Sequence, residues 1–435
     1  MTRQLNMIHR TSPNQTEPRL RPAWRRRGAI LSLLAGIFLL AVYVPHRAET
    51  GAAQPHPEVS TLLDSAGPLD AFQRTLDSMR DRHGFPGATA AYAWTDGPSG
   101  AAATGLADVE TGTPMTPDAR MLAASIGKTF VGATAAALAQ EGVLDLDAPI
   151  GRWLADRPWF GRLPHHERIT LRHLLTHRSG LPDHVHLGGF ADAVARRWHA
   201  AGPPFTPDSL VQFVLDEPPL FTPGDGWAYT DTGFILAGLI IEEATGRDYY
   251  DIIQERFLSP LNLSRTSPSN RRDLPGLAAG YAAENALGFP RKTTTPEGTM
   301  AWHPGIEWTG GGLVSTSGDL ARWGAALFGG NALPEAALDL MLTSSPIDPD
   351  MPGIHYGMGV AIYRGTPAGP VYGHGGWIPG YTSSLRYYDD AGVAIAFQIN
   401  TDIGLETDST SVVQDMEARL MEVVMSAGKR VGKMQ

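Results

Sequence analysis

The amino-acid sequence places short strand-like runs at both ends of the chain and helical patterns between them. Residues 88–94 and 101–105 are apolar runs near the start, and four more follow residue 355, at residues 359–363, 371–374, 383–388 and 393–399. Between about residues 120 and 265 the apolar side chains recur at helical spacing. Strands that are distant in the sequence can share one sheet, and helices then cover its apolar faces. The pattern predicts an α+β fold, an α/β sandwich, in which an antiparallel sheet of N- and C-terminal strands is flanked by helices and carries a mostly helical insertion.

Helix-ending glycines and a turn motif support this predicted fold. Apolar periodicity predicts helices over residues 69–83, 130–140 and 234–244, which end at Gly84, Gly142 and Gly246. The segment Asp389-Asp390-Ala391-Gly392 is typical of a hairpin turn between two strands. Residues 416–425 predict a closing helix. We therefore expect one folded domain over residues 67–428, with a sheet part near residues 67–124 and 305–428 and a helical part near residues 125–304.

The beginning of the chain has a different character. Residues 1–27 hold seven arginines and one acid, a charge of +6, and residues 28–44 carry no charge. A basic flank before an apolar run predicts either a membrane anchor or the core of an export signal, with residues 1–27 in the cytoplasm. We favour the anchor, because the run is longer than a typical signal core; the alternative is secretion after cleavage near Ala53. Residues 45–66 would be a linker to a domain in the cell envelope, periplasmic or extracellular.

Composition excludes several classes of function. The chain has 435 residues and a net charge of −10, so the part after residue 27 carries −16. Nucleic-acid binding needs a basic face, so we predict no nucleic acid as a partner. The absence of cysteine excludes a thiol nucleophile and Cys-based metal sites. His173 and His177 have the spacing of zinc ligands on one helix face, but no His-Glu-x-x-His follows. We predict no metal and no other cofactor.

The tetrapeptide Ser125-Ile126-Gly127-Lys128 carries the strongest chemical signal. Residues three apart share a helix face, so the Lys128 amine can reach the Ser125 hydroxyl and act as its base. A helix that starts at Ser125 would also favour developing negative charge. The chain has only four lysines, and Lys128 is the only one among the first 291 residues. A second Ser-x-x-Lys, Ser426 to Lys429, lies in a polar tail, and we interpret it as a chance match.

Several further segments resemble, in order, those of the serine β-lactamase and penicillin-binding-protein superfamily. The resemblance is to the branch of class C β-lactamases, DD-peptidases and related esterases, and it covers about residues 70–425. The matching segments are Gly105-Leu106-Ala107-Asp108, Thr116-Pro117-Asp118, Ser125-Ile126-Gly127-Lys128, Leu171-Arg172-His173-Leu174-Leu175-Thr176-His177-Arg178-Ser179-Gly180-Leu181, Tyr229-Thr230-Asp231, Gly310-Gly311-Gly312-Leu313-Val314-Ser315-Thr316 and Gly373-His374-Gly375-Gly376.

The resemblance implies a catalytic role for each matching residue. Ser125 would be the acylated nucleophile and Lys128 its proton acceptor. Tyr229, in the position of the family's Tyr-x-Asn tyrosine, would move protons to the leaving group and from the deacylating water. The backbone N–H groups of Ser125 and Trp377 would form the oxyanion hole.

The resemblance also implies a substrate-binding strand. His374 takes the first position of the family's Lys-Thr-Gly motif, where histidine is a known variant. Gly375 and Gly376 would line the substrate on the same inner strand.

Two departures from the family pattern carry information. Asp231 replaces the usual Asn, and a carboxylate accepts hydrogen bonds but does not donate them. An ionised Asp231 would keep Lys128 protonated, so we hypothesise that Tyr229 is the working base. Gly375 lacks the usual hydroxyl that helps to hold a substrate carboxylate, although His374 and arginines such as Arg386 could compensate. This second departure favours ester or neutral amide substrates.

The sequence therefore predicts a serine hydrolase that works through an acyl-enzyme on Ser125. Its expected partner is a small-molecule ester, amide or peptide substrate, and it would contact the membrane through residues 28–44. The sequence does not indicate the oligomeric state. We place an esterase or related acyl hydrolase first, then a DD-peptidase, then a β-lactamase, because all three share the acyl-enzyme. The alternative from another class is a membrane-tethered binding protein that kept the fold and lost turnover.

Overall fold

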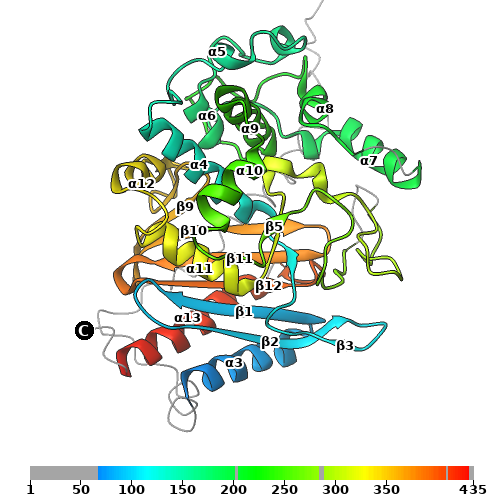
Figure 1. Ribbon diagram of the computed structural model, residues 1–435, viewed down its shortest axis with the longest axis vertical. Helices are drawn as coiled ribbons and strands as arrows, with labels where there is room; N and C mark the ends of the chain where they lie inside the picture. Colours follow the sequence, from blue (N-terminus) through cyan, green and yellow to red (C-terminus); the bar gives the residue numbers. More distant parts are fainter. Residues whose placement is uncertain (1–66, 201–203, 284–288, 408–409, 431–435) are drawn as a thin grey trace, which may run out of the picture.

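Figure 1 shows the computed structural model, which describes residues 67–200, 204–283, 289–407 and 410–430. Within these ranges no helix combines the length and apolar character needed to cross a bilayer. The predicted cytoplasmic segment, the predicted anchor or signal core and the predicted linker, residues 1–66, lie outside the described residues.

Nine antiparallel strands form the main sheet, in the order β3-β2-β1-β12-β11-β10-β9-β8-β7. The two ends of the chain meet where β1 pairs with β12, with Ala91 opposite Ala396. The predicted α+β fold and the shared N- and C-terminal sheet are thereby confirmed. The strand bounds are β1 Gly87–Trp94, β2 Ser99–Asp108, β3 Thr113–Pro114, β7 Ser345–Pro346, β8 Ile354–Tyr356, β9 Ala361–Thr366, β10 Gly369–Ile378, β11 Tyr381–Tyr388 and β12 Val393–Ile399.

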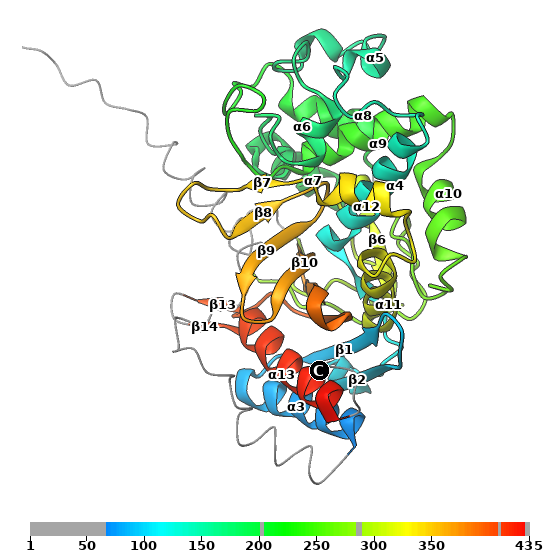
Figure 2. The same ribbon diagram turned by 90° about the vertical axis from the view of Figure 1, so that its left-hand side faces the viewer.

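The central strands are buried on both faces: β12 is apolar except for Gln398, whereas β11 also buries Thr382, Ser383, Ser384 and Arg386. Helices α3 (Pro68–His83) and α13 (Val412–Arg430) lie side by side on one face (Figure 2). Helix α11 (Ser317–Phe328) covers the other face. On the α3 face, the ring of Phe72 meets that of Tyr92 edge-on at 5.3 Å. The sheet is thus the middle layer of a sandwich.

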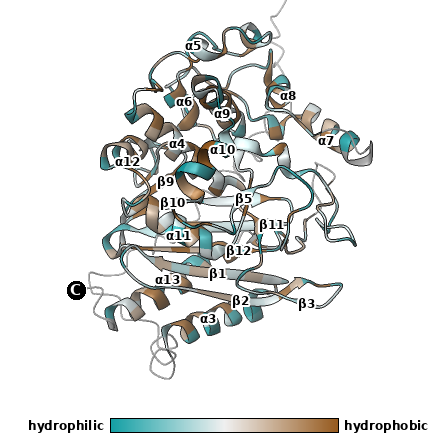
Figure 3. Ribbon diagram, in the orientation of Figure 1, coloured by the Kyte–Doolittle hydropathy of each residue, from teal (hydrophilic) through white to brown (hydrophobic). Residues whose placement is uncertain are grey.

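The helical part sits at one end of the α11 face. Helix α9 (Asp231–Thr245) is apolar along most of its length and forms the buried centre against α4 (Figure 3). The predicted stops hold, because Gly84 and Gly246 cap their helices in the left-handed conformation, at φ 71° and 65°. The other helices are α4 Lys128–Gln140, α5 Gly151–Leu154, α6 Leu171–Leu175, α7 Gly188–Ala200, α8 Pro207–Val211, α10 Tyr249–Ile253 and α12 Glu335–Leu342.

A small three-stranded sheet, in the order β4-β6-β5, links the two parts. Its strands are β4 Met121–Leu122, β5 Ser267–Pro268 and β6 Leu313–Ser315. Because β4 directly precedes Ser125 and β6 directly follows the glycine run, this sheet brings both segments together. A two-stranded pair, β13 Glu406–Thr407 and β14 Thr410–Ser411, precedes α13.

Candidate active site

Ser125 lies on a tight turn between β4 and α4. The turn is a 3₁₀ helix, Ala124–Gly127, and the α-helix begins only at Lys128, so the expected helix start at Ser125 is wrong. Ala124 adopts φ 48°, which is uncommon for a residue other than glycine. The chain leaves the short β4–β6 ladder and reverses within this turn, which places Ser125 ahead of the N-terminus of α4.

Lys128 is wholly buried beneath this turn. Its Nζ donates to Oγ of Ser125 at 3.0 Å, to a carboxylate oxygen of Asp231 and to the carbonyl of Gly310. Three acceptors use the full donor capacity of an ammonium group. Nζ also lies 4.9 Å from the ring centre of Tyr229, within the range of a cation–π contact. Lys128 thus links the turn, α9 and the glycine run.

Tyr229 approaches the same serine from the segment that leads into α9. Its hydroxyl donates to Oγ of Ser125 at 2.8 Å, and its ring packs 4.2 Å from that of His177. Burial, and then the neighbouring Asp231, raise the pKa of Tyr229 well above its usual value. The neutral phenol is therefore the resting form, and Ser125 receives both predicted proton-transfer groups.

Asp231 is the first residue of α9, where the helix dipole favours a carboxylate. Its side chain is 26% exposed, whereas that of its partner Lys128 is fully buried. The backbone N–H of Thr230 donates to Nδ1 of His177 at 3.2 Å, which fixes the entry to the helix. His177 is therefore a structural residue here, and His173 likewise caps α6 by accepting from the N–H of Thr170. Neither histidine takes part in a metal-binding cluster within the described ranges.

His374 lies on β10, close to Tyr229, with a ring-centre separation of 6.1 Å. Its Nδ1 contacts the carbonyl of Gly375 at 2.5 Å, and since a carbonyl only accepts, Nδ1 carries the hydrogen. Nε2 then accepts from the hydroxyl of Tyr356 at 2.8 Å. Burial lowers the pKa of His374 to about 3, so the ring is neutral. Both ring nitrogens are engaged away from Ser125, which suits a role in the substrate strand better than one in proton transfer.

Gly376 allows β10 to run against the Ser125 turn. A Cβ at this position would lie 2.4 Å from the carbonyl oxygen of Ala123 and 2.2 Å from Oγ of Ser383, closer than real atoms approach. The predicted oxyanion hole, built from the N–H groups of Ser125 and Trp377, requires this close approach.

Arg386 does not belong to the site, and the expectation that it could compensate near Gly375 is wrong. Leu385 stands opposite His374 in the β10–β11 ladder, so Arg386, the next residue, points through the other face. There it is 2% exposed and pairs with Glu417 of α13 at 3.0 Å.

Glu307, which sequence reasoning missed, lies just before the glycine run. Burial, with a smaller contribution from Asp231, raises the pKa of Glu307 to about 8. Its Oε2 is buried without a hydrogen-bond partner among the described residues. No motif marks Glu307 in the sequence; its proximity to Lys128 and Asp231 arises from the fold.

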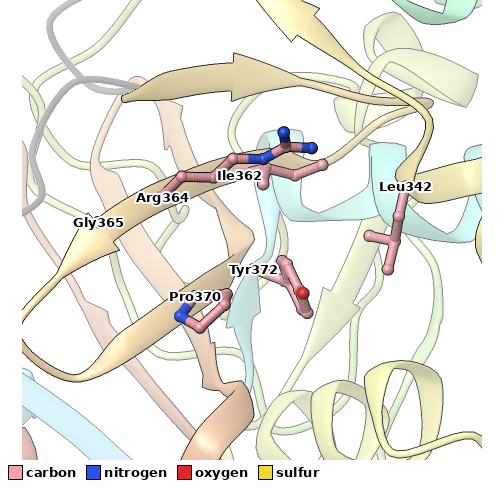
Figure 4. Close-up of a pocket in the computed structure, with 6 residues that line it drawn as sticks. All are labelled: Leu342, Ile362, Arg364, Gly365, Pro370 and Tyr372. Carbon is pink, nitrogen blue, oxygen red and sulfur yellow. The ribbon is translucent and has the colours of Figure 1, made fainter. Parts of the chain in front are cut away.

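A cavity of about 360 Å³ lies elsewhere, between α12 and the strands β9 and β10 (Figure 4). Neither Ser125, Lys128 nor Tyr229 lines it; its walls are Leu342, Ile362, Arg364, Gly365, Pro370 and Tyr372. We assign it no part in the chemistry at Ser125.

Several known proteins are similar to this chain in sequence or in structure. A penicillin-binding protein of Bacillus subtilis is 28% identical over 66% of this chain and 62% of its own length. The esterase EstB of Burkholderia gladioli is 34% identical over 37% of this chain and 41% of its own length. The chain thus spans less than two thirds of the length of these two relatives. The D-amino acid amidase of Ochrobactrum anthropi is similar in structure, with a TM-score of 0.69 and 28% identity over 83% of this chain and 100% of that one.

The sequence profile of the Beta-lactamase family matches residues 72–415, which is most of the described domain. The matched range spans every residue brought together around Ser125. The chain therefore belongs to the Beta-lactamase family, as the ordered motifs had predicted.

Proposed function

We propose that this chain is a serine hydrolase that works through an acyl-enzyme on Ser125 and cleaves ester bonds in preference to amide or peptide bonds. The observation that carries the proposal is the convergence on one oxygen. Oγ of Ser125 receives Nζ of Lys128 at 3.0 Å and the hydroxyl of Tyr229 at 2.8 Å. A serine with two such neighbours has the arrangement of an activated nucleophile.

In the proposed acylation step, Oγ of Ser125 attacks the substrate carbonyl carbon and a carbon–oxygen bond forms. Tyr229 takes the serine proton while it passes its own proton to the leaving oxygen or nitrogen, so no free phenolate is needed. The bond between that atom and the carbonyl carbon breaks, and the acyl group stays on Ser125. This relay fits the raised pKa of Tyr229. Lys128 supplies positive charge beside the relay, and the N–H groups of Ser125 and Trp377 would stabilise the tetrahedral oxyanion.

Deacylation reverses this relay. A water molecule attacks the acyl carbon, gives its proton to Tyr229, and Tyr229 returns a proton to Oγ of Ser125. The acid is released and the resting hydrogen bonds are restored. Tyr229 is thus the working base in both halves of the proposed reaction.

Ester or neutral amide substrates rank first because the site has little to hold a substrate carboxylate. Gly375 brings no hydroxyl, and Arg386 is buried and paired with Glu417. A DD-peptidase or a β-lactamase substrate carries such a carboxylate. An amide or peptide hydrolase is the second candidate, because the whole length of the D-amino acid amidase matches 83% of this chain.

The proposed location is the cell envelope, with residues 28–44 as an anchor and the catalytic domain outside the cytoplasmic membrane. The basic flank and uncharged run support this proposal. Cell fractionation and protease treatment of spheroplasts test it: a detergent-extracted, protease-accessible chain is expected. A chain found in the cytosolic fraction would overturn the location, and a shortened chain in the medium would favour secretion after cleavage.

Active-site labelling tests the proposed function. A fluorophosphonate probe should label the wild type and fail to label Ser125→Ala. Ser426→Ala is the matched control, because Ser426 heads the second Ser-x-x-Lys of the chain and should label normally. No labelling by this probe or by a fluorescent penicillin would favour a binding protein without turnover. A nitrophenyl ester, a D-Ala-D-Ala peptide and a chromogenic cephalosporin, assayed side by side, then rank the substrates.

A further inference from the structure

Trp377 carries a predicted oxyanion-hole N–H, yet its side chain lies on the opposite face of the sheet. It pairs with Thr382 on β11, which pairs with Ile399 on β12. Directly paired residues share a face, and Ile399 belongs to the core beneath α3 and α13. The indole, which is 40% exposed, can therefore form contacts on the face of the sheet away from Ser125.

Asp402 holds it. One carboxylate oxygen of Asp402 accepts from Nε1 of Trp377 at 3.1 Å, and the other accepts from the backbone N–H of Ala283 at 2.7 Å. The backbone N–H of Gly380, in the β10–β11 turn, also donates to this carboxylate. Asp402 thus joins the end of β10, the hairpin tip and the segment around residue 283.

Further hydrogen bonds and close packing hold this hairpin tip in place. The hydroxyl of Tyr381 donates to the carbonyl of Ala278 at 2.8 Å, and Oγ1 of Thr293 lies 2.7 Å from the same hydroxyl. A Cβ on Gly380 would lie 2.4 Å from Thr293. Asp402 connects this hairpin tip to the side chain of Trp377.

We propose that Asp402 is a positioning residue for the oxyanion hole: by holding the indole of Trp377 and the N–H of Gly380, it fixes the end of β10 so that the N–H of Trp377 is directed at the substrate oxygen beside Ser125. The proposal rests on the proposed function. Donors to an oxyanion act only when they are fixed before the charge develops, so a small displacement lowers the rate without lowering substrate affinity.

The test compares Asp402→Ala and Asp402→Asn with the wild type on a nitrophenyl ester. Asp402→Ala should lower kcat roughly tenfold or more with KM nearly unchanged, and Asp402→Asn, which keeps one acceptor, should fall between. Asp389→Asn is the matched control, because Asp389 accepts from Tyr372 at the far end of the same hairpin and should leave both constants unchanged.

Phenylboronic acid gives a second readout that a purely structural role would not move. It adds to a serine hydroxyl as a tetrahedral anion, so its inhibition constant should rise by the same factor as kcat falls. Trp377→Phe, which retains the carboxylate, removes the indole N–H and serves if Asp402→Ala does not fold. The double variant should be no slower than Asp402→Ala alone.

The outcomes separate the two proposals. Three results would overturn the proposed role of Asp402 and leave the proposed function standing. They are an unchanged kcat in folded Asp402→Ala, a rise in KM without a fall in kcat, and additive effects in the double variant. A wild type that neither labels nor hydrolyses would overturn the proposed function itself.

Discussion

Asp231 binds Nζ of Lys128 across 103 residues of sequence, and together they join the first turn of α9 to the first turn of α4. The pair brings a partly exposed carboxylate beside the buried amine that contacts Ser125. An amide at this position would bring no charge. The negative charge of Asp231 therefore acts on groups around Ser125, among them Tyr229 and Glu307, whose pKa values it raises.

Asp231→Asn should shift the alkaline limb of the pH–rate profile to lower pH. The relay uses the neutral phenol of Tyr229, and removing the carboxylate removes one cause of its raised pKa, so the neutral phenol is lost at lower pH. The measurement is kcat/KM against pH for the wild type, Asp231→Asn and the remote surface control Asp216→Asn. An alkaline limb that stays in place would reject Tyr229 as the working base.

Tyr229→Phe should lower kcat by about 10²–10⁴-fold, because it removes a proton-transfer group and keeps the ring. The ring contact with His177 is retained, so the free energy of unfolding should change by only about 1 kcal/mol. Tyr356→Phe is the matched control: it removes the hydrogen bond to His374 and none to Ser125. Equal losses of kcat in the two variants would contradict the relay.

Glu307→Gln should change how stability depends on pH. An unfolded glutamate ionises near 4.5, whereas burial raises the pKa of Glu307 in the folded protein to about 8. Between these values the folded state binds more protons, so the free energy of unfolding falls as the pH rises. Glutamine does not titrate, so the free energy of unfolding of the variant should match that of the wild type near pH 4. Between pH 4 and pH 8 it should exceed the wild-type value by a growing amount, about 1.4 kcal/mol per pH unit and a few kcal/mol in all.

Urea unfolding at a series of pH values measures this difference. Glu141→Gln is a control of opposite sign, because hydrogen bonds from Arg256 lower the pKa of Glu141. That stabilisation is present above pH 4.5 and is lost as the pH falls. The gap between Glu141→Gln and the wild type should therefore close at low pH. A constant gap between Glu307→Gln and the wild type would refute the raised pKa of Glu307.

Arg386→Met should destabilise the fold by about 3–5 kcal/mol, because it leaves Glu417 buried without its ion-pair partner. The double variant with Glu417→Leu should recover much of this loss, since it removes both buried charges. Activity per folded molecule should not change in either variant, because the pair lies on the face away from Ser125. Thermal melts and kinetics well below the melting temperature separate the two effects; a selective loss of activity would return Arg386 to the substrate site.

Much of the fold follows from patterns that are local in the chain. The stops at Gly84 and Gly246 and the turn before Gly392 arise because glycine adopts the left-handed conformation without strain. Strand β12 is recognisable because burial on both faces favours a nearly continuous apolar run. The contact between Ser125 and Lys128 also follows from local spacing, although the turn that carries it is tighter than an α-helix.

What the sequence by itself determined is therefore the family, the longer strands of the main sheet, several of the helices and the residues that meet within one turn. The tertiary structure decided which faces and which distant partners these residues take. A register shift of one residue reverses every side chain of a strand, so the placement of Arg386 behind the sheet depends on the ladder and not on its neighbours in the chain. The same holds for Asp402, which meets Trp377 only because β10 and β12, the two neighbours of β11, end at the same end of the sheet.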